Sequence, residues 1–553
     1  MNKTIKIRCK NNKKTLNFPI GSTLSEIFPA FGLEMPYGPT SAKVNNKVVG
    51  MDFTVFHDKD VEFLDITDAS GHRAYTRTLF FVLCKAVHDL YPSSEVMIDI
   101  PVSNGYYCDL NIGHTLTTED VDAIRRRMQE IIAAAHVINR HECPTDEAIR
   151  IFEQHGTNSK AKLLRTTGRL YTTYYDIDGY ADHYYGALLV NTRQLHLFDV
   201  VKYYDGILLR LPLRNDPTVL GELIRQDKMF GIFQEHHRWQ DILGMTTVGD
   251  FNEAVKAGHA TDIVNVSEAL QEKKIAHIAE QIANREGVRV VLIAGPSSSG
   301  KTTSSKRLAI QLLTNCIMPK VIELDNYFVN REHTPRDKDG DYDYESLYAL
   351  DLEQFNKDVT DLLAGKEVAM PTYNFKKGER EYLGNTLKLA QGDILLMEGI
   401  HGLNPELTRL IPEDQKFRLF VSALTTLNID DHNWIGTYDN RMLRRIIRDH
   451  QYRGASALDT IKRWASVRRG EEKWIMPFHE NADAMFNSSL LFELSVIKNY
   501  ALPILQQVPS NTPEYAEASR LIKFLSYFEP LDEKDIPSTS LLREFLGGSS
   551  FHY

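Results

Sequence analysis

Residues 295–303 read Gly-Pro-Ser-Ser-Ser-Gly-Lys-Thr-Thr and directly follow an apolar run. The glycines let backbone N–H groups close around phosphate oxygens, and a helix starting at the end of the loop adds partial positive charge. The amine of Lys301 can reach the β- and γ-phosphates, and the Thr302 hydroxyl can hold Mg²⁺. We therefore predict a nucleoside triphosphate site that comprises Gly295, Pro296, Ser297, Ser298, Ser299, Gly300, Lys301, Thr302 and Thr303.

Three more groups of residues can take part in phosphate chemistry. Asp325 follows an apolar run and can orient and deprotonate an attacking hydroxyl, although it can equally cap a turn. Glu398 ends another apolar run and can hold Mg²⁺ or merely order a loop. Five arginines lie between 441 and 453, and they can neutralise a transferred phosphoryl group or form an ordinary exposed helix face.

Alternating strands and helices position these residues. Strands are predicted at 288–294, 320–324, 394–397 and 417–421, and helices at 302–313 and 352–363. This alternation predicts a doubly wound parallel sheet, in which ligands gather at the carboxyl ends of the strands. The loop, Asp325 and Glu398 all fall at such ends.

Residues 288–490 resemble the uridine kinase / phosphoribulokinase family of P-loop kinases. The resemblance is carried by the loop, by 325–328 (Asp-Asn-Tyr-Phe), by 371–375 (Pro-Thr-Tyr-Asn-Phe), by Glu398-Gly399 and by the arginine-dense segment. It implies transfer of the γ-phosphate of ATP to a nucleoside 5′-hydroxyl, with Mg²⁺ as cofactor. The implied roles are catalysis by Asp325, Lys301, Arg445, Arg448 and Arg453, substrate binding by Asp343, Tyr373 and Phe375, and metal binding by Thr302 and Glu398.

Some positions depart from the family or allow another interpretation. Where pyrimidine nucleoside kinases carry a base-contacting histidine, this chain has Gly378, and a second lid arginine is replaced by Ala455. Asp343 lies among other acids and can be a solvated loop residue, while Tyr373 and Phe375 can be core residues. Two alternatives stay open: a sugar-phosphate kinase resembling phosphoribulokinase, and an RNA-binding protein that uses the P-loop as a switch.

The N-terminal part resembles modules of threonyl-tRNA synthetases. Residues 1–66 combine alternating strands with one short helix and resemble the TGS module, a ubiquitin-like β-grasp unit. Residues 67–225 resemble the α+β second additional domain, which edits through a His-x-x-x-His pair and a Cys-x-x-x-His pair. Here these positions are His72, Thr76, Tyr184 and Leu188, so neither editing nor a metal site is expected. A weak or regulatory RNA or tRNA contact through residues 1–225 remains an expectation.

Two segments connect or follow these regions. Residues 226–287 form a polar connection and an amphipathic helix, which is expected to pack on the next domain rather than form a coiled coil. Residues 491–553 are expected to be a helical extension that covers the kinase domain and carries no chemistry. The fold class is thus α/β, a P-loop kinase preceded by a β-grasp module and a synthetase-like α+β domain.

Composition limits the setting of the protein. The chain has 553 residues, a net charge of −10 and no global basic field for nucleic acid. Its five cysteines are scattered, which is typical of reduced thiols. No secretory signal and no membrane-spanning run are seen, so we expect a cytoplasmic protein, without a membrane partner, that forms a homo-oligomer.

Overall fold

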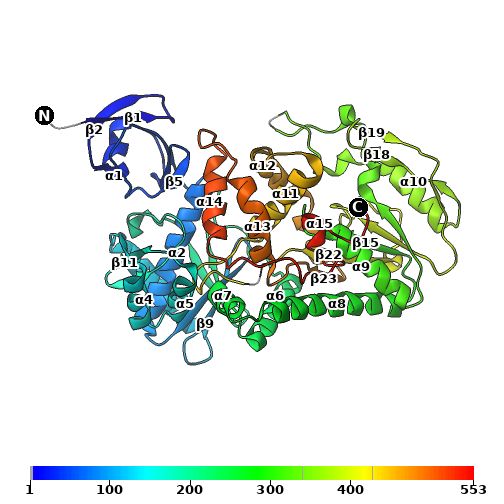
Figure 1. Cartoon of the computed structure of the whole chain (residues 1–553), viewed down its shortest axis with the longest axis horizontal. Helices are drawn as coiled ribbons and strands as arrows, with labels where there is room; N and C mark the ends of the chain where they lie inside the picture. Colours follow the sequence, from blue (N-terminus) through cyan, green and yellow to red (C-terminus); the bar gives the residue numbers. More distant parts are fainter. Residues whose placement is uncertain (1–3, 339, 426) are drawn as a thin grey trace.

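The computed structural model describes residues 4–338, 340–425 and 427–553. The β-grasp sheet lies at one end of an elongated arrangement and the kinase-like sheet at the other, with the synthetase-like domain below the first (Figure 1). Among the described residues, no helix is long and apolar enough to cross a membrane. All five cysteines are free thiols.

The first unit is a five-stranded sheet with one short helix. Thr23 and Glu26 form a capping box that starts α1 (Leu24–Ile27), and strict alternation along β1 buries Ile5, Ile7 and Cys9. The strand order is β2 (Thr15–Pro19), β1 (Thr4–Cys9), β7 (Lys59–Leu64), β4 (Ser41–Val44) and β5 (Lys47–Val49). The strands β1 and β7 are parallel, as a β-grasp arrangement requires.

The second unit is built around the long helix α2 (Ala69–Leu90). Its buried face packs with α3 (Thr118–Ala133) onto an antiparallel sheet of β13 (Asp199–Tyr203), β14 (Gly206–Arg210), β9 (Gly105–Asn111) and β8 (Glu95–Val102). A smaller sheet of β10 (Asn139–Pro144), β11 (Tyr171–Ile177) and β12 (Tyr180–Asp182) packs with α4 (Thr145–Gln154) and α5 (Asn158–Thr167).

Three helices lead to the kinase-like region: α6 (Asp227–Leu243), α7 (Val248–Lys256) and α8 (Ala260–Asn284). Ile275, Ile278 and Ile282 of α8 are buried in the same apolar cluster as Leu308 of α9 (Lys301–Thr314). The amphipathic helix therefore packs on the following domain, as its pattern predicts.

The kinase-like sheet is parallel throughout. Its order is β16 (Pro319–Glu323), β21 (Ile394–Glu398), β15 (Val290–Ala294), β22 (Lys416–Ser422) and β23 (Ala484–Asn487). The first four strands match the predicted ones to within two residues. The helices around the sheet are α9, α10 (Leu352–Leu363), α11 (Thr437–Arg453) and α12 (Ala457–Trp474).

The C-terminal segment is wound back over both halves of the molecule. It contains α13 (Glu493–Leu505), α14 (Tyr515–Leu525) and α15 (Arg543–Leu546). Figure 1 shows α14 beside β5 of the first unit, and α15 and the C-terminus beside α9. The tail thus contacts the β-grasp unit as well as the kinase-like region.

Candidate functional site

The predicted phosphate loop joins β15 to α9. A Cβ on Gly295 would lie 2.1 Å from the carbonyl oxygen of Val421 on the neighbouring strand, so only glycine fits there. Gly300 has a φ of +83° and turns the chain directly into the helix. The loop backbone and the first N–H groups of α9 therefore form one concave cradle at the strand end.

Two buried ion pairs support this loop from behind. Arg441 donates to the carbonyl oxygen of Ser297 at 3.0 Å and pairs with Glu471, which in turn accepts from the Ser297 N–H at 3.1 Å. Arg444 is fully buried and pairs with Glu493. These two arginines hold the loop in shape. Their buried acid partners lie 30 and 49 residues away, so the sequence offered no local signal for them.

The predicted catalytic groups share one electrostatic environment. Asp325 lies in the short helix Leu324–Tyr327, directly after β16, and keeps a solvent-open surface. Enclosure by the protein raises the pKa of its carboxyl, while the positive charges of Lys301, Arg453 and Arg448 oppose that rise. The Lys301 ammonium donates to the Pro296 carbonyl oxygen at 3.3 Å, which folds it over the loop.

One aspartate gathers the three predicted lid arginines. Asp449 accepts from Arg445 at 3.2 Å and from Arg448 at 3.2 Å, and it pairs with Arg453 at 3.4 Å. Arg445 also donates to the Ser297 hydroxyl at 3.0 Å, so it touches the phosphate loop itself. Burial and neighbouring positive charge lower the pKa of Arg448 to about 10. Asp449 lies four residues from Arg445 and from Arg453 on α11, a spacing that could have identified it.

The predicted metal ligands touch each other. The Thr302 hydroxyl donates to Glu398 Oε1 at 2.9 Å, between the start of α9 and the end of β21. Burial and the nearby Asp325 charge raise the pKa of Glu398 to about 7, although Lys301 opposes this. Hydroxyl and carboxylate oxygens with excess negative charge fit a hard divalent cation such as Mg²⁺. Glu345, whose pKa burial and the Glu471 charge also raise to about 7, is a site residue that sequence reasoning missed.

The predicted substrate residues lie further out on the same side. Tyr373 on β18 (Thr372–Asn374) is 7% exposed and packs against Phe328 and Phe375 at ring distances of 5.6 and 5.1 Å. Phe375 is 59% exposed, so it has a free surface for stacking where Tyr373 has little. Asp343 is partly buried and lies on the loop before Ser346. The Ser346 N–H donates to the carbonyl oxygen of Asp343.

A different side chain fills the space opened by the missing base-contacting residue. A Cβ on Gly378 would lie 2.8 Å from the guanidinium carbon of Arg331, and Gly378 itself has a φ of +77°. Arg331 donates to the Phe375 carbonyl oxygen at 2.6 Å. The guanidinium of Arg331 thus lies beside Gly378, the position at which the resemblance leads one to expect an imidazole.

The C-terminal tail reaches the first turn of α9. The carboxylate of Glu544 accepts from the Thr303 hydroxyl at 2.6 Å and from the Thr303 N–H at 3.3 Å. The Tyr553 hydroxyl lies 2.9 Å from the same Thr303 oxygen, and Leu541 packs against Gly300. The tail therefore occupies part of the cradle, a role that its sequence did not suggest.

The positions of the editing motifs carry no hydrolytic site. His72 Nε2 lies 3.2 Å from the Pro212 carbonyl oxygen, and burial lowers the pKa of its imidazole. The Thr76 hydroxyl donates to the His72 carbonyl oxygen at 2.9 Å. Tyr184 and Leu188 are each 2% exposed and belong to the apolar core.

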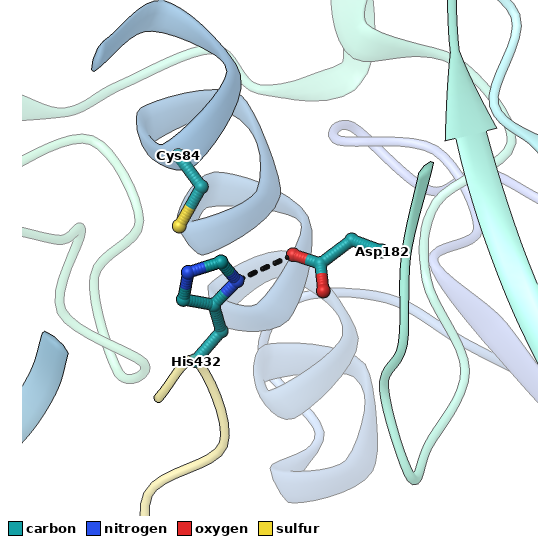
Figure 2. Close-up of side chains that lie close together, drawn as sticks. All are labelled: Cys84, Asp182 and His432. Atoms are coloured by element: carbon teal, nitrogen blue, oxygen red, sulfur yellow. Dashed lines mark hydrogen bonds and ion pairs between the residues drawn. The ribbon is translucent and has the colours of Figure 1, made fainter. Parts of the chain in front are cut away.

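A second polar cluster lies deep inside the molecule. Cys84, Asp182 and His432 point toward one another, and their ligand atoms lie within 4.8 Å (Figure 2). His432 Nδ1 donates to Asp182 at 2.8 Å; burial opposes protonation, but the Cys84 and Asp182 charges raise the pKa of His432 to about 10. In the described structure the imidazole and the carboxylate therefore form an ion pair with each other.

This buried polar cluster joins two domains. The Lys160 ammonium lies 2.8 Å from Asp182 in the synthetase-like domain and 2.8 Å from Asp430 in the kinase-like region. Each of these side chains is at most 1% exposed, which leaves no path for a substrate. Buried charges of opposite sign therefore fix the two domains against each other.

Comparison with known proteins finds different relatives for two parts of the chain. Residues 290–491 match the model of the Phosphoribulokinase / Uridine kinase family. Two solved structures also align: a D-glycerate 3-kinase from Cryptococcus neoformans var. grubii and a protein from Bacillus stearothermophilus described as a possible uridine kinase. The D-glycerate 3-kinase is 14% identical with a TM-score of 0.20, and the alignment covers 48% of this chain and 89% of that one. The Bacillus stearothermophilus protein is 18% identical with a TM-score of 0.25, and the alignment covers 39% of this chain and 98% of that one. At such scores they carry no argument.

The N-terminal region matches threonine–tRNA ligases. The enzyme of Clostridioides difficile (strain 630) is 31% identical over 124 residues, which cover 22% of this chain and 19% of that enzyme. The enzyme of Syntrophomonas wolfei is 29% identical over 160 residues, which cover 29% of this chain and 25% of that enzyme. The chain thus spans only about a fifth to a quarter of the length of these relatives. The predicted resemblances and the predicted fold class are confirmed.

Proposed function

We propose that the protein is an ATP-dependent nucleoside kinase that transfers the γ-phosphate of ATP to a nucleoside 5′-hydroxyl. The supporting observation is the single electrostatic environment that Asp325 shares with Lys301, Arg448 and Arg453 beside the loop. The match of residues 290–491 to a kinase family supports the phosphotransferase class, while the nucleoside acceptor rests on this proposal.

The side chains divide the work of the reaction. The loop N–H groups and Lys301 bind the triphosphate, and Asp325 accepts the proton of the acceptor hydroxyl as the new O–P bond forms. The bond between the γ-phosphorus and the β–γ bridging oxygen breaks in the same transfer, and ADP leaves. The raised pKa of Asp325 makes it a stronger base than an ordinary aspartate. Arg445, Arg448 and Arg453 neutralise charge on the transferred group. Mg²⁺, when bound with ATP at Thr302 and Glu398, neutralises phosphate charge.

Nucleotide binding has to displace a carboxylate in this arrangement. Glu544 takes up two donors at the first turn of α9, where phosphate oxygens bind in P-loop proteins. Because a triphosphate and a carboxylate repel each other, ATP and Glu544 compete for Thr303. The proposal therefore includes a tail that moves when the nucleotide binds.

Radiolabelled transfer from ATP to a panel of nucleosides tests the function. Asp325→Asn is expected to lower kcat by about 100-fold or more with little change in ATP affinity, since general base catalysis contributes about 10²–10⁴. Asp361→Asn is the control, because Asp361 forms an ion pair with the surface residue Lys366 and has no part in the proposed reaction. If no nucleoside accepts phosphate, or if Asp325→Asn keeps full activity, the proposal is wrong.

One observation favours a second candidate, a sugar-phosphate kinase resembling phosphoribulokinase. Arg331, which fills the space beside Gly378, can bind a phosphate on the acceptor better than it can read a base. Sugar phosphates belong in the same panel for this reason. Phosphorylation of a sugar phosphate that is lost in Arg331→Gln would select this candidate.

A further inference from the structure

A large cavity lies far from the phosphate loop, where three parts of the chain meet. It has a volume of about 820 Å³, and residues of β5 in the β-grasp unit, of α2 in the synthetase-like domain and of α14 in the tail line it. Figure 1 shows where these three elements lie. No residue of the loop or of α9 lines it. Ligand pockets typically measure about 300–1,000 Å³, so a small molecule of nucleotide size fits here.

Positive charge dominates the cavity wall. Six cationic side chains line it, against two acidic ones, Asp52 and Glu142. The cationic residues are Lys47, Arg73, Arg77, Arg140, Arg520 and Lys523. The net charge of the chain is −10, so this local excess of positive charge runs against the overall charge of the protein.

Half of these cations have acid partners. Arg140 pairs with Asp52 and Glu142, and both Arg73 and Arg520 pair with Glu517. These pairs fix the wall in place.

The other three cations lack an acid partner among the described residues. Within the part of the chain that the structure describes, no carboxylate lies within 4.0 Å of Lys47, Arg77 or Lys523. Enclosure, together with the positive charges of Arg169 and Arg77, lowers the pKa of Lys523 to about 7. An anion placed among these three cations would relieve their mutual repulsion.

Arg77 is held in a defined orientation. It donates to the Ala187 carbonyl oxygen at 3.2 Å and lies over the Tyr185 ring at 5.1 Å. A Cβ on Gly186 would lie 2.3 Å from its guanidinium carbon, so the chain leaves space for the arginine at that residue. An ordered guanidinium with free donors is the group that binds phosphate with two hydrogen bonds.

We propose that this cavity binds a small phosphorylated molecule of nucleotide size, at a site separate from the kinase site. Lys47, Arg77 and Lys523 would bind the phosphate, and the hydroxyls of Ser519 and Ser526 line the same cavity. The rings of Phe53 and Tyr175 add surface on which a planar base can pack. Nothing about this site depends on the reaction proposed for the loop.

Calorimetric titration of the full chain tests the proposal in a Lys301→Ala background, which weakens the loop site. The probes are uridine monophosphate, adenosine diphosphate and inorganic pyrophosphate. We expect one site for at least one probe, weakened about tenfold or more by Arg77→Gln and by Lys523→Gln. Lys366→Gln is the control, because Lys366 is an exposed lysine that pairs with Asp361 and does not line the cavity.

Several results would overturn the inference. They are the absence of binding for all three probes, equal binding in the Arg77 and Lys523 variants, or complete loss of binding in Lys301→Ala alone. Binding of bulk tRNA that needs Arg77, without binding of any small probe, would assign the cavity to RNA instead. Thermal melting of each variant shows whether it is folded. If Lys301→Ala is not folded, the number of binding sites is measured in the protein with Lys301 intact. A fall from two binding sites to one in Lys523→Gln would then support the proposal, and an unchanged number of binding sites would refute it.

Discussion

Replacing Glu544 by glutamine removes a negative charge from the first turn of α9 and keeps the shape of the side chain. The carboxylate now accepts from the Thr303 hydroxyl at 2.6 Å and from its N–H at 3.3 Å. A glutamine oxygen can still accept these bonds, but without the charge that strengthens them and repels phosphate. The variant should therefore bind ATP more tightly than the unmodified protein.

The size of the effect follows from two contributions. A carboxylate at a helix N-terminus is stabilised by about 0.3–1 kcal/mol. A hydrogen bond to a charged acceptor exceeds one to a neutral acceptor by about 1 kcal/mol. Together they give about 1–2 kcal/mol, and since about 1.4 kcal/mol corresponds to a tenfold change, ATP affinity should rise about 5- to 30-fold.

Calorimetric titration with ATP and Mg²⁺ measures this change directly. Glu533→Gln is the matched control, because Glu533 pairs with Arg543, the neighbour of Glu544. Loosening of the tail alone would affect both variants, whereas removal of the competing charge affects only Glu544→Gln. An unchanged or weaker ATP affinity in Glu544→Gln would show that the carboxylate does not compete with phosphate.

Three further predictions concern other parts of the structure. Because the raised pKa of Glu398, about 7, keeps it partly protonated at neutral pH, the Mg²⁺ concentration for half-maximal activity should fall as pH rises through that value; Glu398→Gln should remove this dependence. Asp449→Asn should lower kcat by about tenfold with smaller effects on KM, because it releases the three arginines that the proposed mechanism places on the transferred phosphoryl group; an effect on KM alone would contradict this. Lys160→Met should cost about 3–5 kcal/mol in urea unfolding, because it removes the cation shared by two buried aspartates and leaves each with weaker compensation from a histidine. The half-exposed pair of Lys162 provides the control, with Lys162→Met expected to cost about 1 kcal/mol or less; equal costs for the two variants would refute the argument.

Local patterns were sufficient for the elements that carry the kinase chemistry. The strand before the loop, the loop itself and the start of α9 lie within 25 consecutive residues, and their glycines and apolar runs have meanings that do not depend on distant contacts. Asp325 and Glu398 were predictable because each directly follows or ends such a run. Parallel strands then bring their carboxyl ends to one edge of the sheet.

Contacts between distant segments could not be predicted in the same way. Arg441 and Arg445 look alike in the sequence, yet one pairs with a buried glutamate behind the loop while the other touches the loop hydroxyl. Only the packing of α11 against α12 and the loop separates these roles. Glu544 is an ordinary acid in a helical tail until the chain returns to α9.

The amino-acid sequence by itself determined the P-loop, the positions of four strands around it and the loss of the editing residues, because these depend on residue types at short spacing. The tertiary structure decided which charges meet: the carboxylate on Thr303, the buried lysine between two domains, and the basic cavity between β5, α2 and α14. Each of these brings together residues hundreds of positions apart. Their electrostatic interactions depend on distance in space, which residue spacing along the chain does not contain.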